Sequence, residues 1–113
     1  MTTEHSKLVG KVLKHLNSLP QCTAFPVRPG PWGGKKGTSD IIFCYKGLFG
    51  SSEVKVGYDK PTKLQNIFMR KVKEAKGDAR VSRTIEDIKQ QIKSMEEKST
   101  ALKVYYEENR YLN

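Results

Sequence analysis

Apolar residues recur at helical spacing in three segments of the chain. In the first, positions 8, 9, 12, 13 and 16 are apolar with lysines between them, and Pro20 ends the segment. The second begins near Pro61, is apolar at positions 64, 67, 68, 72 and 75, and stops at Gly77. The third runs from about 84 to 97, with apolar positions 85, 88, 92 and 95. These spacings predict three amphipathic helices.

Shorter apolar and β-branched runs between the helical segments predict strands. They cover residues 22–27, 39–45, 49–56 and 78–82. A turn at Lys46-Gly47 joins the second and third strands, and the Gly- and Pro-rich residues 29–37 predict a loop. The resulting order, α-β-β-β-α-β-α, predicts an α/β fold in a single domain, residues 1–113, with a small mixed β-sheet flanked by helices.

Charge narrows the classes of partner. The 113 residues carry a formal net charge of +9, which favours a polyanion such as nucleic acid. The longest apolar run, residues 41–45, is far too short to span a membrane, and the N-terminal residues lack the layout of a signal peptide. Cys22 and Cys44 have no nearby Cys or His at metal-site spacing, so we expect buried reduced thiols and a cytoplasmic protein.

The predicted hairpin of residues 39–56 is the strongest candidate for chemistry. A two-residue turn at Lys46-Gly47, continued along the register, places Asp40 opposite Glu53. The strand period of two puts Lys55 on the same face as Glu53. Directly opposed side chains have Cβ atoms about 5 Å apart. The sequence therefore predicts two carboxylates and one lysine in a single site.

Two facing carboxylates repel each other unless something offsets their charge. At an effective dielectric near 20 the repulsion is about 3 kcal/mol. A raised pKa on one carboxyl group or the adjacent lysine can offset it, and a divalent cation offsets it best. Carboxylate oxygens with open coordination positions suit Mg²⁺, with Mn²⁺ able to substitute. The alternative is an ordinary surface strand with a Glu–Lys pair and no catalytic role.

The same residues carry a family resemblance. Gly37-Thr38-Ser39-Asp40 followed by Glu53-Val54-Lys55 resembles the PD-(D/E)xK nuclease signature. The continuation is a run from Lys60 to Gln65 before a helix, then Gly77, a strand and a run from Ser82 to Asp87. It is similar to the virus-type replication-repair nuclease (VRR-NUC) domain in its stand-alone, phage-like form. The resemblance covers residues 4–92, and its one departure is Ser39 in place of the usual proline.

The resemblance implies a restriction-endonuclease-like or Holliday-junction-resolvase-like core. It implies an Mg²⁺-dependent endonuclease that hydrolyses DNA phosphodiester bonds, with branched DNA such as four-way junctions as substrate. The implied metal ligands are Asp40, Glu53 and Glu4, and Lys55 would act on the nucleophile or on the developing phosphate charge. A phage source would make the host cytoplasm its compartment.

Two further residues enter the site through the resemblance. Glu4 matches an acidic residue at the start of the first helix, and Gln65 matches a glutamine beside the site. Positions 4, 8 and 12 share a helical stripe, so Glu4 is expected above the apolar face and not in solvent. Each residue has an alternative role. Glu4 would favour the helix dipole as a first-turn carboxylate, and Gln65 would complete a capping box.

Basic and aromatic residues near the hairpin indicate where DNA would lie. The expected DNA-binding residues are Arg28, Trp32, Lys35 and Lys36 in and beside the loop, and Lys60 and Lys63 before the second helix. Trp32 fits stacking on an unpaired base and equally an anchor packed on the core. The second basic group also fits a solvated helix face. His5 and His15 lie on different faces of the first helix, and neither has an assigned role.

The sequence is also compatible with two rival functions, and it favours one assembly. The rivals are a nicking or non-branch-specific DNase of the same fold, and a non-catalytic basic module that binds nucleic acid. A symmetric homodimer is expected because a four-way junction needs two coordinated cuts. Residues 99–113 fit a strand or a helix equally well, and their aromatic and aliphatic side chains suit either a dimer interface or packing on the same domain.

Overall fold

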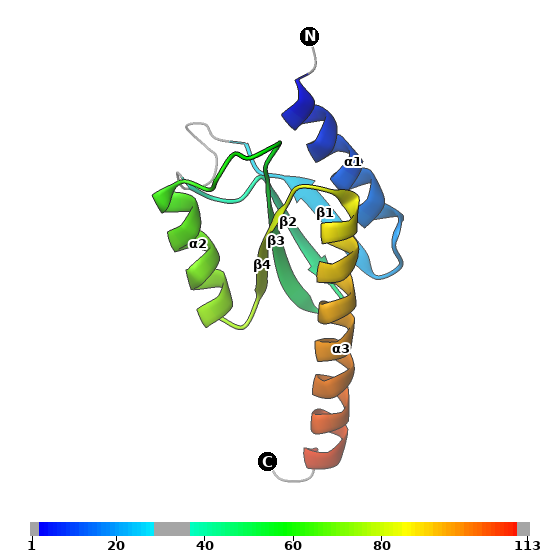
Figure 1. Cartoon of the computed structure of the whole chain (residues 1–113). Helices are drawn as coiled ribbons and strands as arrows, with labels where there is room; N and C mark the ends of the chain where they lie inside the picture. The colour runs from blue at the N-terminus through cyan, green and yellow to red at the C-terminus, as the bar shows by residue number, and fades with distance from the viewer. Residues whose placement is uncertain (1–2, 29–36, 111–113) are drawn as a thin grey trace.

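The computed structural model describes residues 3–28 and 37–110 (Figure 1). Within these residues, three helices and four strands follow one another in the predicted order. They are α1 Glu4–Ser18, β1 Cys22–Pro26, β2 Ile41–Tyr45, β3 Leu48–Val54, α2 Lys63–Glu74, β4 Asp78–Ser82 and α3 Ile85–Asn109. The expectation of a small α/β fold with a mixed sheet is confirmed.

The four strands form one sheet in the order β1-β2-β3-β4. β1, β2 and β3 are antiparallel neighbours, whereas β3 and β4 run parallel because α2 connects them as a crossover. The β2–β3 turn has positive φ at Lys46 (50°) and Gly47 (83°), as a two-residue hairpin turn requires. Tyr45 consequently pairs with Leu48, which confirms the predicted register.

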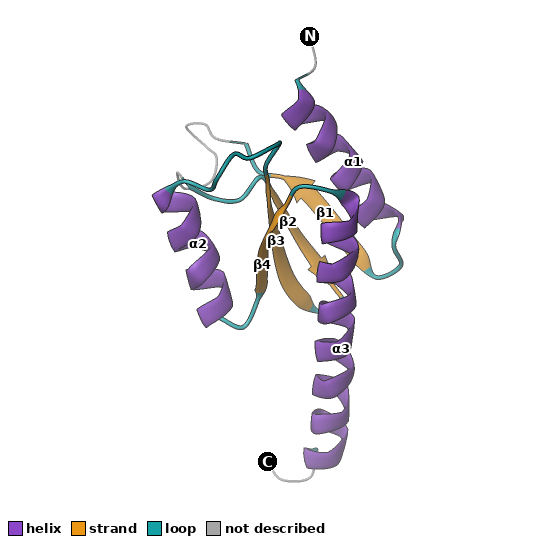
Figure 2. Cartoon of the chain, viewed as in Figure 1, coloured by secondary structure: helices purple, strands orange, loops and turns teal. Residues whose placement is uncertain are grey.

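Helices cover both faces of the sheet (Figure 2). Along β2, the alternate residues Ile41, Phe43 and Tyr45 are buried in one core with apolar residues of α1 and α3. α2 packs on the opposite face, where Met69 meets Ala79 of β4 in a second, smaller core. This three-layer arrangement leaves the C-terminal end of β3 between the first turns of α1 and α2 (Figure 1).

Residues 99–109 continue α3, so the described part of the tail is helical as far as Asn109. The predicted end near residue 97 was wrong: α3 runs for 25 residues to Asn109. Gly and Pro are absent from this stretch, so nothing in it breaks the helix. We call residues 99–109 the α3 extension. Figure 1 shows it running past the sheet, at the end of the molecule opposite the N-terminal turn of α1. Leu102, Val104, Tyr105 and Tyr106 are all exposed there.

The two cysteines are more exposed than the sequence predicted. Cys44 is exposed and Cys22 is half-buried, both as free thiols, so burial of the pair was wrong. Cys44 alternates with the buried residues of β2 and therefore points to the face that α1 and α3 leave uncovered.

In the described part of the chain, no helix is long and apolar enough to cross a membrane.

Candidate active site

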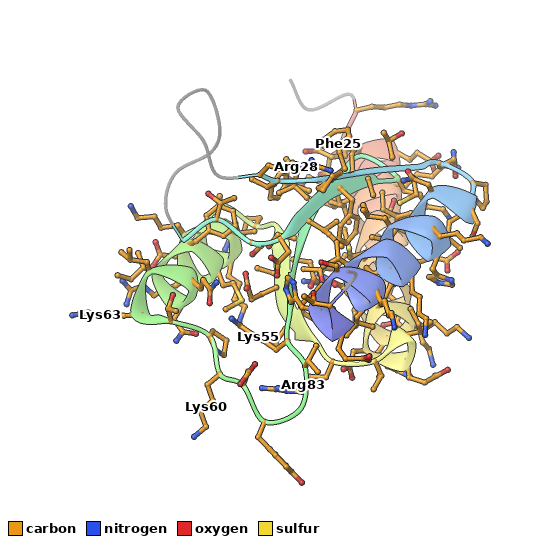
Figure 3. All side chains as sticks on the ribbon, turned by 90° about the horizontal axis from the view of Figure 1, so that it is seen from above. Phe25, Arg28, Lys55, Lys60, Lys63 and Arg83 are labelled. Atoms are coloured by element: carbon orange, nitrogen blue, oxygen red, sulfur yellow. The ribbon has the colours of Figure 1, made fainter. Side chains whose placement is uncertain are left out.

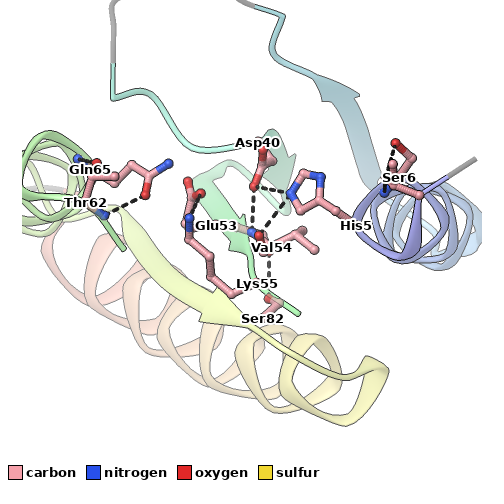
Figure 4. A network of polar contacts seen from close by, with 11 residues as sticks. His5, Ser6, Asp40, Glu53, Val54, Lys55, Thr62, Gln65 and Ser82 are labelled. Carbon is pink, nitrogen blue, oxygen red and sulfur yellow. Dashed lines mark hydrogen bonds and ion pairs between the residues drawn. The ribbon is translucent and has the colours of Figure 1, made fainter. Parts of the chain in front are cut away.

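Asp40 lies one residue before β2, where the hairpin register continues it opposite Glu53. Its backbone C=O accepts the Val27 N–H at 2.8 Å, which ties it to the end of β1. Its side-chain Oδ2 accepts the backbone N–H of Val54 at 2.8 Å (Figure 4). The Asp40 carboxylate is thus held against β3 beside Glu53, as predicted from the register.

The segment that leads into Asp40 is held by two close contacts. Gly37 has φ +91°, and a Cβ added there would lie 2.6 Å from the Leu64 Cβ, so only glycine fits between this segment and α2. Ser39, which stands where the family resemblance has proline, is 1% exposed, and its Oγ donates to Ser51 Oγ at 3.4 Å. Ser39 therefore anchors the approach to Asp40 through a buried hydroxyl pair.

Glu53 is the buried carboxylate of the site. The residue is 1% exposed, and its Oε1 lies 3.5 Å from the Lys55 Nζ. Its Oε2 is buried and has no hydrogen-bond partner among the described residues. Leaving a buried carboxylate oxygen without a partner costs about 1–3 kcal/mol or more. A group that supplied the missing interaction would therefore be stabilised at Oε2.

The electrostatics of Glu53 reflect this burial. Desolvation raises the pKa of Glu53, the neighbouring Asp40 carboxyl raises it further, and Lys55 lowers it, with a result of about 7. Near neutral pH the site therefore exchanges a proton easily. A cation placed between Asp40 and Glu53 would favour the charged form of Glu53 and displace that proton.

Lys55 is held on the same side of the sheet as Glu53 by an extension of the strand ladder. Its backbone N–H donates to the Ser82 C=O at 3.1 Å, so the parallel pairing of β3 with β4 continues one residue past Val54. The Lys55 side chain is only 16% exposed. Figure 4 shows it running alongside the Glu53 carboxylate. The predicted grouping of Asp40, Glu53 and Lys55 is present.

His5 also reaches this site, and the sequence argument missed it. His5 Nε2 lies 3.1 Å from the Val54 C=O and 3.4 Å from Asp40 Oδ2. The spacing of α1 carried only part of the signal. Val12 and Leu16 are fully buried, and the same helical stripe, extended seven residues back from Val12, reaches His5.

The structure does not bring Glu4 to the site. Its side chain is 79% exposed and pairs with Lys7 at 3.7 Å. Neighbouring helical positions are about 100° apart, so the turn that directs His5 at Asp40 directs Glu4 into solvent. The expectation that Glu4 would sit above the apolar face is therefore corrected.

Gln65 caps α2 at the opposite side of the site. Its side-chain Oε1 accepts the backbone N–H of Thr62 at 2.8 Å, and the backbone N–H of Gln65 donates to Thr62 Oγ1 at 3.2 Å. The capping-box alternative is thus present. In Figure 4 the amide nitrogen of Gln65 points toward Glu53, so the side chain is directed at the site while it caps the helix.

Basic side chains surround this end of the sheet. Figure 3 shows Lys55 near the centre of the view, with Lys60 and Lys63 toward α2 and Arg28 at the end of β1. Arg28, Lys60 and Lys63 are all exposed. Arg83 donates to the Gly57 C=O at 2.8 Å and holds the loop after Lys55. The predicted DNA contacts at Trp32, Lys35 and Lys36 lie outside the described residues.

The donor set at the site can be compared with the needs of a metal ion. Across residues 3–28 and 37–110, no three His, Cys, Asp or Glu side chains are grouped closely enough to hold one. Mg²⁺ is commonly bound through only one or two carboxylates, with water and phosphate oxygens completing its shell. Asp40 and Glu53, with the orphan Oε2, fit that requirement, and the hard oxygen donors favour Mg²⁺ or Mn²⁺ over softer metals.

A scan against protein-family models and a search of curated proteins found no match to this chain. The resemblance to the VRR-NUC domain therefore rests on the motif residues described above.

Proposed function

We propose that the protein is an Mg²⁺-dependent DNA endonuclease in which Asp40, Glu53 and Lys55 form the active site. The observation that carries the proposal is Glu53. It is a buried carboxylate with one unpartnered oxygen, beside a second carboxylate and a lysine. The net charge of +9 supports a polyanionic substrate. The order of the PD-(D/E)xK motif residues supports the same chemistry.

The site residues divide the work as follows. Asp40 and Glu53 would hold the divalent cation, which when bound polarises a phosphoryl oxygen and lowers the pKa of a bound water. Glu53 must lose its proton to serve as a ligand, which its pKa of about 7 allows at and above neutral pH. The ammonium group of Lys55 is placed to stabilise negative charge on the phosphate or to orient the attacking water.

The remaining groups bind the substrate. Lys60, Lys63 and Arg28 are exposed around the site and would contact phosphates on either side of the scissile bond. Gln65 would contribute its amide N–H groups from the α2 side. We propose branched DNA, including four-way junctions, as the preferred substrate on the family resemblance alone. A homodimer is proposed as the working form for the same substrate.

A panel of labelled duplex, flap, splayed-arm and four-way-junction DNA tests the function directly. With Mg²⁺ we expect cleavage of branched substrates above duplex, and with EDTA no cleavage of any. Equal cleavage of all substrates would favour a nicking or non-branch-specific DNase. Binding with no cleavage in Mg²⁺ or Mn²⁺ would favour a non-catalytic nucleic-acid-binding module and overturn the proposal.

A further inference from the structure

His5 connects α1 to both strands that carry the acidic pair. Its Nε2 contacts the Val54 C=O at 3.1 Å and Asp40 Oδ2 at 3.4 Å. A carbonyl and a carboxylate are both acceptors, so Nε2 carries the hydrogen and donates. We propose that His5 is a positioning residue that fixes the orientation of the Asp40 carboxylate for cation binding. The cation in this inference rests on the proposed function, whereas the His5 contacts rest on the geometry alone.

The geometry divides the two Asp40 oxygens between different tasks. Oδ2 faces two donors, the Val54 N–H at 2.8 Å and the His5 N–H at 3.4 Å. With Oδ2 engaged in this way, rotation of the carboxylate is restricted, and Oδ1 is the oxygen that we assign to the cation. Because Val54 directly follows Glu53, the His5 ring also ties this orientation to the strand that carries the second ligand (Figure 4).

Because His5 is partly exposed, its substitution tests a positioning role and not a packing role. Its side chain is 46% exposed, so replacing it removes little buried apolar surface. The change should therefore act on Asp40 and much less on the fold. Donors of this kind behind a carboxylate ligand typically change metal affinity by about 10- to 100-fold when they are removed.

Two neutral amides provide a matched pair of variants. In glutamine the amide nitrogen is as many bonds from Cα as the His Nε2, so His5→Gln keeps the donor within reach. In asparagine it is one bond shorter, so His5→Asn retains polarity but not the contact. His15→Asn, at the last turn of the same helix, makes the same chemical change away from the site.

The first readout needs no metal. Val54 N–H donates to Asp40 Oδ2, so its exchange with solvent deuterium reports how firmly that oxygen is held. We expect exchange about five- to tenfold faster in His5→Asn, and wild-type exchange in His5→Gln and His15→Asn. Unchanged exchange in His5→Asn, or equally fast exchange in His5→Gln, would overturn the positioning role.

The second readout is the affinity for Mn²⁺ measured by calorimetry. We expect His5→Asn to bind Mn²⁺ about 10- to 100-fold more weakly than wild type, and His5→Gln to bind it within about threefold. Equal Mn²⁺ affinity in His5→Asn and wild type would also overturn the inference. A wild-type protein that binds no Mn²⁺ would instead refute the proposed metal site, and the Val54 exchange would still decide whether His5 positions Asp40.

Discussion

The backbone N–H of Val54 donates to Asp40 Oδ2 at 2.8 Å, and Val54 directly follows Glu53 in β3. Strand β3 thus supplies the buried Glu53 carboxylate and also the backbone donor that holds the Asp40 carboxylate opposite it. Any shift in the β2–β3 register would break this bond and separate the two carboxylates at once. The hairpin turn that sets the register is therefore part of the construction of the site.

Removal of the Lys55 charge should impair turnover much more than substrate binding. We expect Lys55→Ala to lower the single-turnover cleavage rate by about 10²- to 10³-fold, because the ammonium group acts on charge that develops in the transition state. Affinity for DNA in Ca²⁺ should change by less than about threefold. Lys93→Ala, an exposed lysine of α3, is the control and should cleave at the wild-type rate. Cleavage by Lys55→Ala at a rate near wild type would remove Lys55 from the mechanism.

Burial of Glu53 should make the metal-free protein less stable at high pH. The pKa of Glu53 is raised from 4.5 to about 7, so its contribution to stability is complete below 4.5 and is lost as the pH rises through 7. Glu53→Gln removes this dependence. In EDTA, its free energy of unfolding should gain about 3 kcal/mol relative to wild type between pH 4.5 and pH 8.

Urea denaturation at several pH values measures this gain. Glu74→Gln makes the same chemical change at a side chain that is 69% exposed, and it is the control. A constant difference between Glu53→Gln and wild type from pH 4.5 to 8 would show that Glu53 is not perturbed by its surroundings.

Exposed lysines on the α2 side of the site should determine part of the salt dependence of DNA binding. The log–log slope of affinity against salt is about −0.9 per neutralised phosphate. We expect Lys60→Ala plus Lys63→Ala to make the slope shallower by about 1 to 2. Lys93→Ala plus Lys103→Ala removes the same charge from α3 and should leave the slope unchanged. Equal effects of the two double variants would mean that DNA has no preferred path past α2.

The α3 extension is expected to pair in a homodimer, and its place in the fold constrains how. It lies at the opposite end of the molecule from the site (Figure 1), so antiparallel pairing would send the two sites to opposite ends of the dimer. Parallel pairing puts both sites at one end, as coordinated cutting of a junction requires. Light scattering should give twice 12.8 kDa, and truncation after Thr100 should reduce the mass to one chain.

Single cysteines distinguish the two pairings in a Cys22→Ser, Cys44→Ser background. Leu102→Cys and Asn109→Cys are one heptad apart on the same face of α3. Parallel pairing should form a disulfide-linked dimer with either variant, whereas antiparallel pairing cannot do so with both. A mass of one chain at micromolar concentration would refute the homodimer altogether.

The parts of the site that the sequence predicted depend on local rules. A two-residue turn sets the register, and strand alternation sets the faces, so Asp40, Glu53 and Lys55 follow from a stretch of continuous sequence. His5 could not be found in the same way, because its contact with Asp40 depends on how α1 crosses the sheet. Glu4 and His5 differ by one helical position, and only the packed position of α1 determines which of them faces the site.

The length of α3 illustrates a different limit. Burial of its apolar stripe ends near Met95, and the prediction ended the helix with the stripe. Helix propensity favours continuation through the α3 extension, where Leu102, Val104, Tyr105 and Tyr106 remain exposed. Apolar periodicity indicates which part of a helix is packed. It does not indicate how far the helix continues where its side chains are exposed.

Single-turnover cleavage of a labelled four-way junction by wild type, Asp40→Asn and Glu53→Gln tests the central claim most directly. The assay is run in Mg²⁺ and in EDTA, with circular dichroism to show that each variant is folded. We predict cleavage by wild type in Mg²⁺ alone, and a loss of at least about 10²-fold in both variants. Cleavage at the wild-type rate by either folded variant, or wild-type cleavage that persists in EDTA, would contradict the assignment of Asp40 and Glu53 as the metal-binding pair.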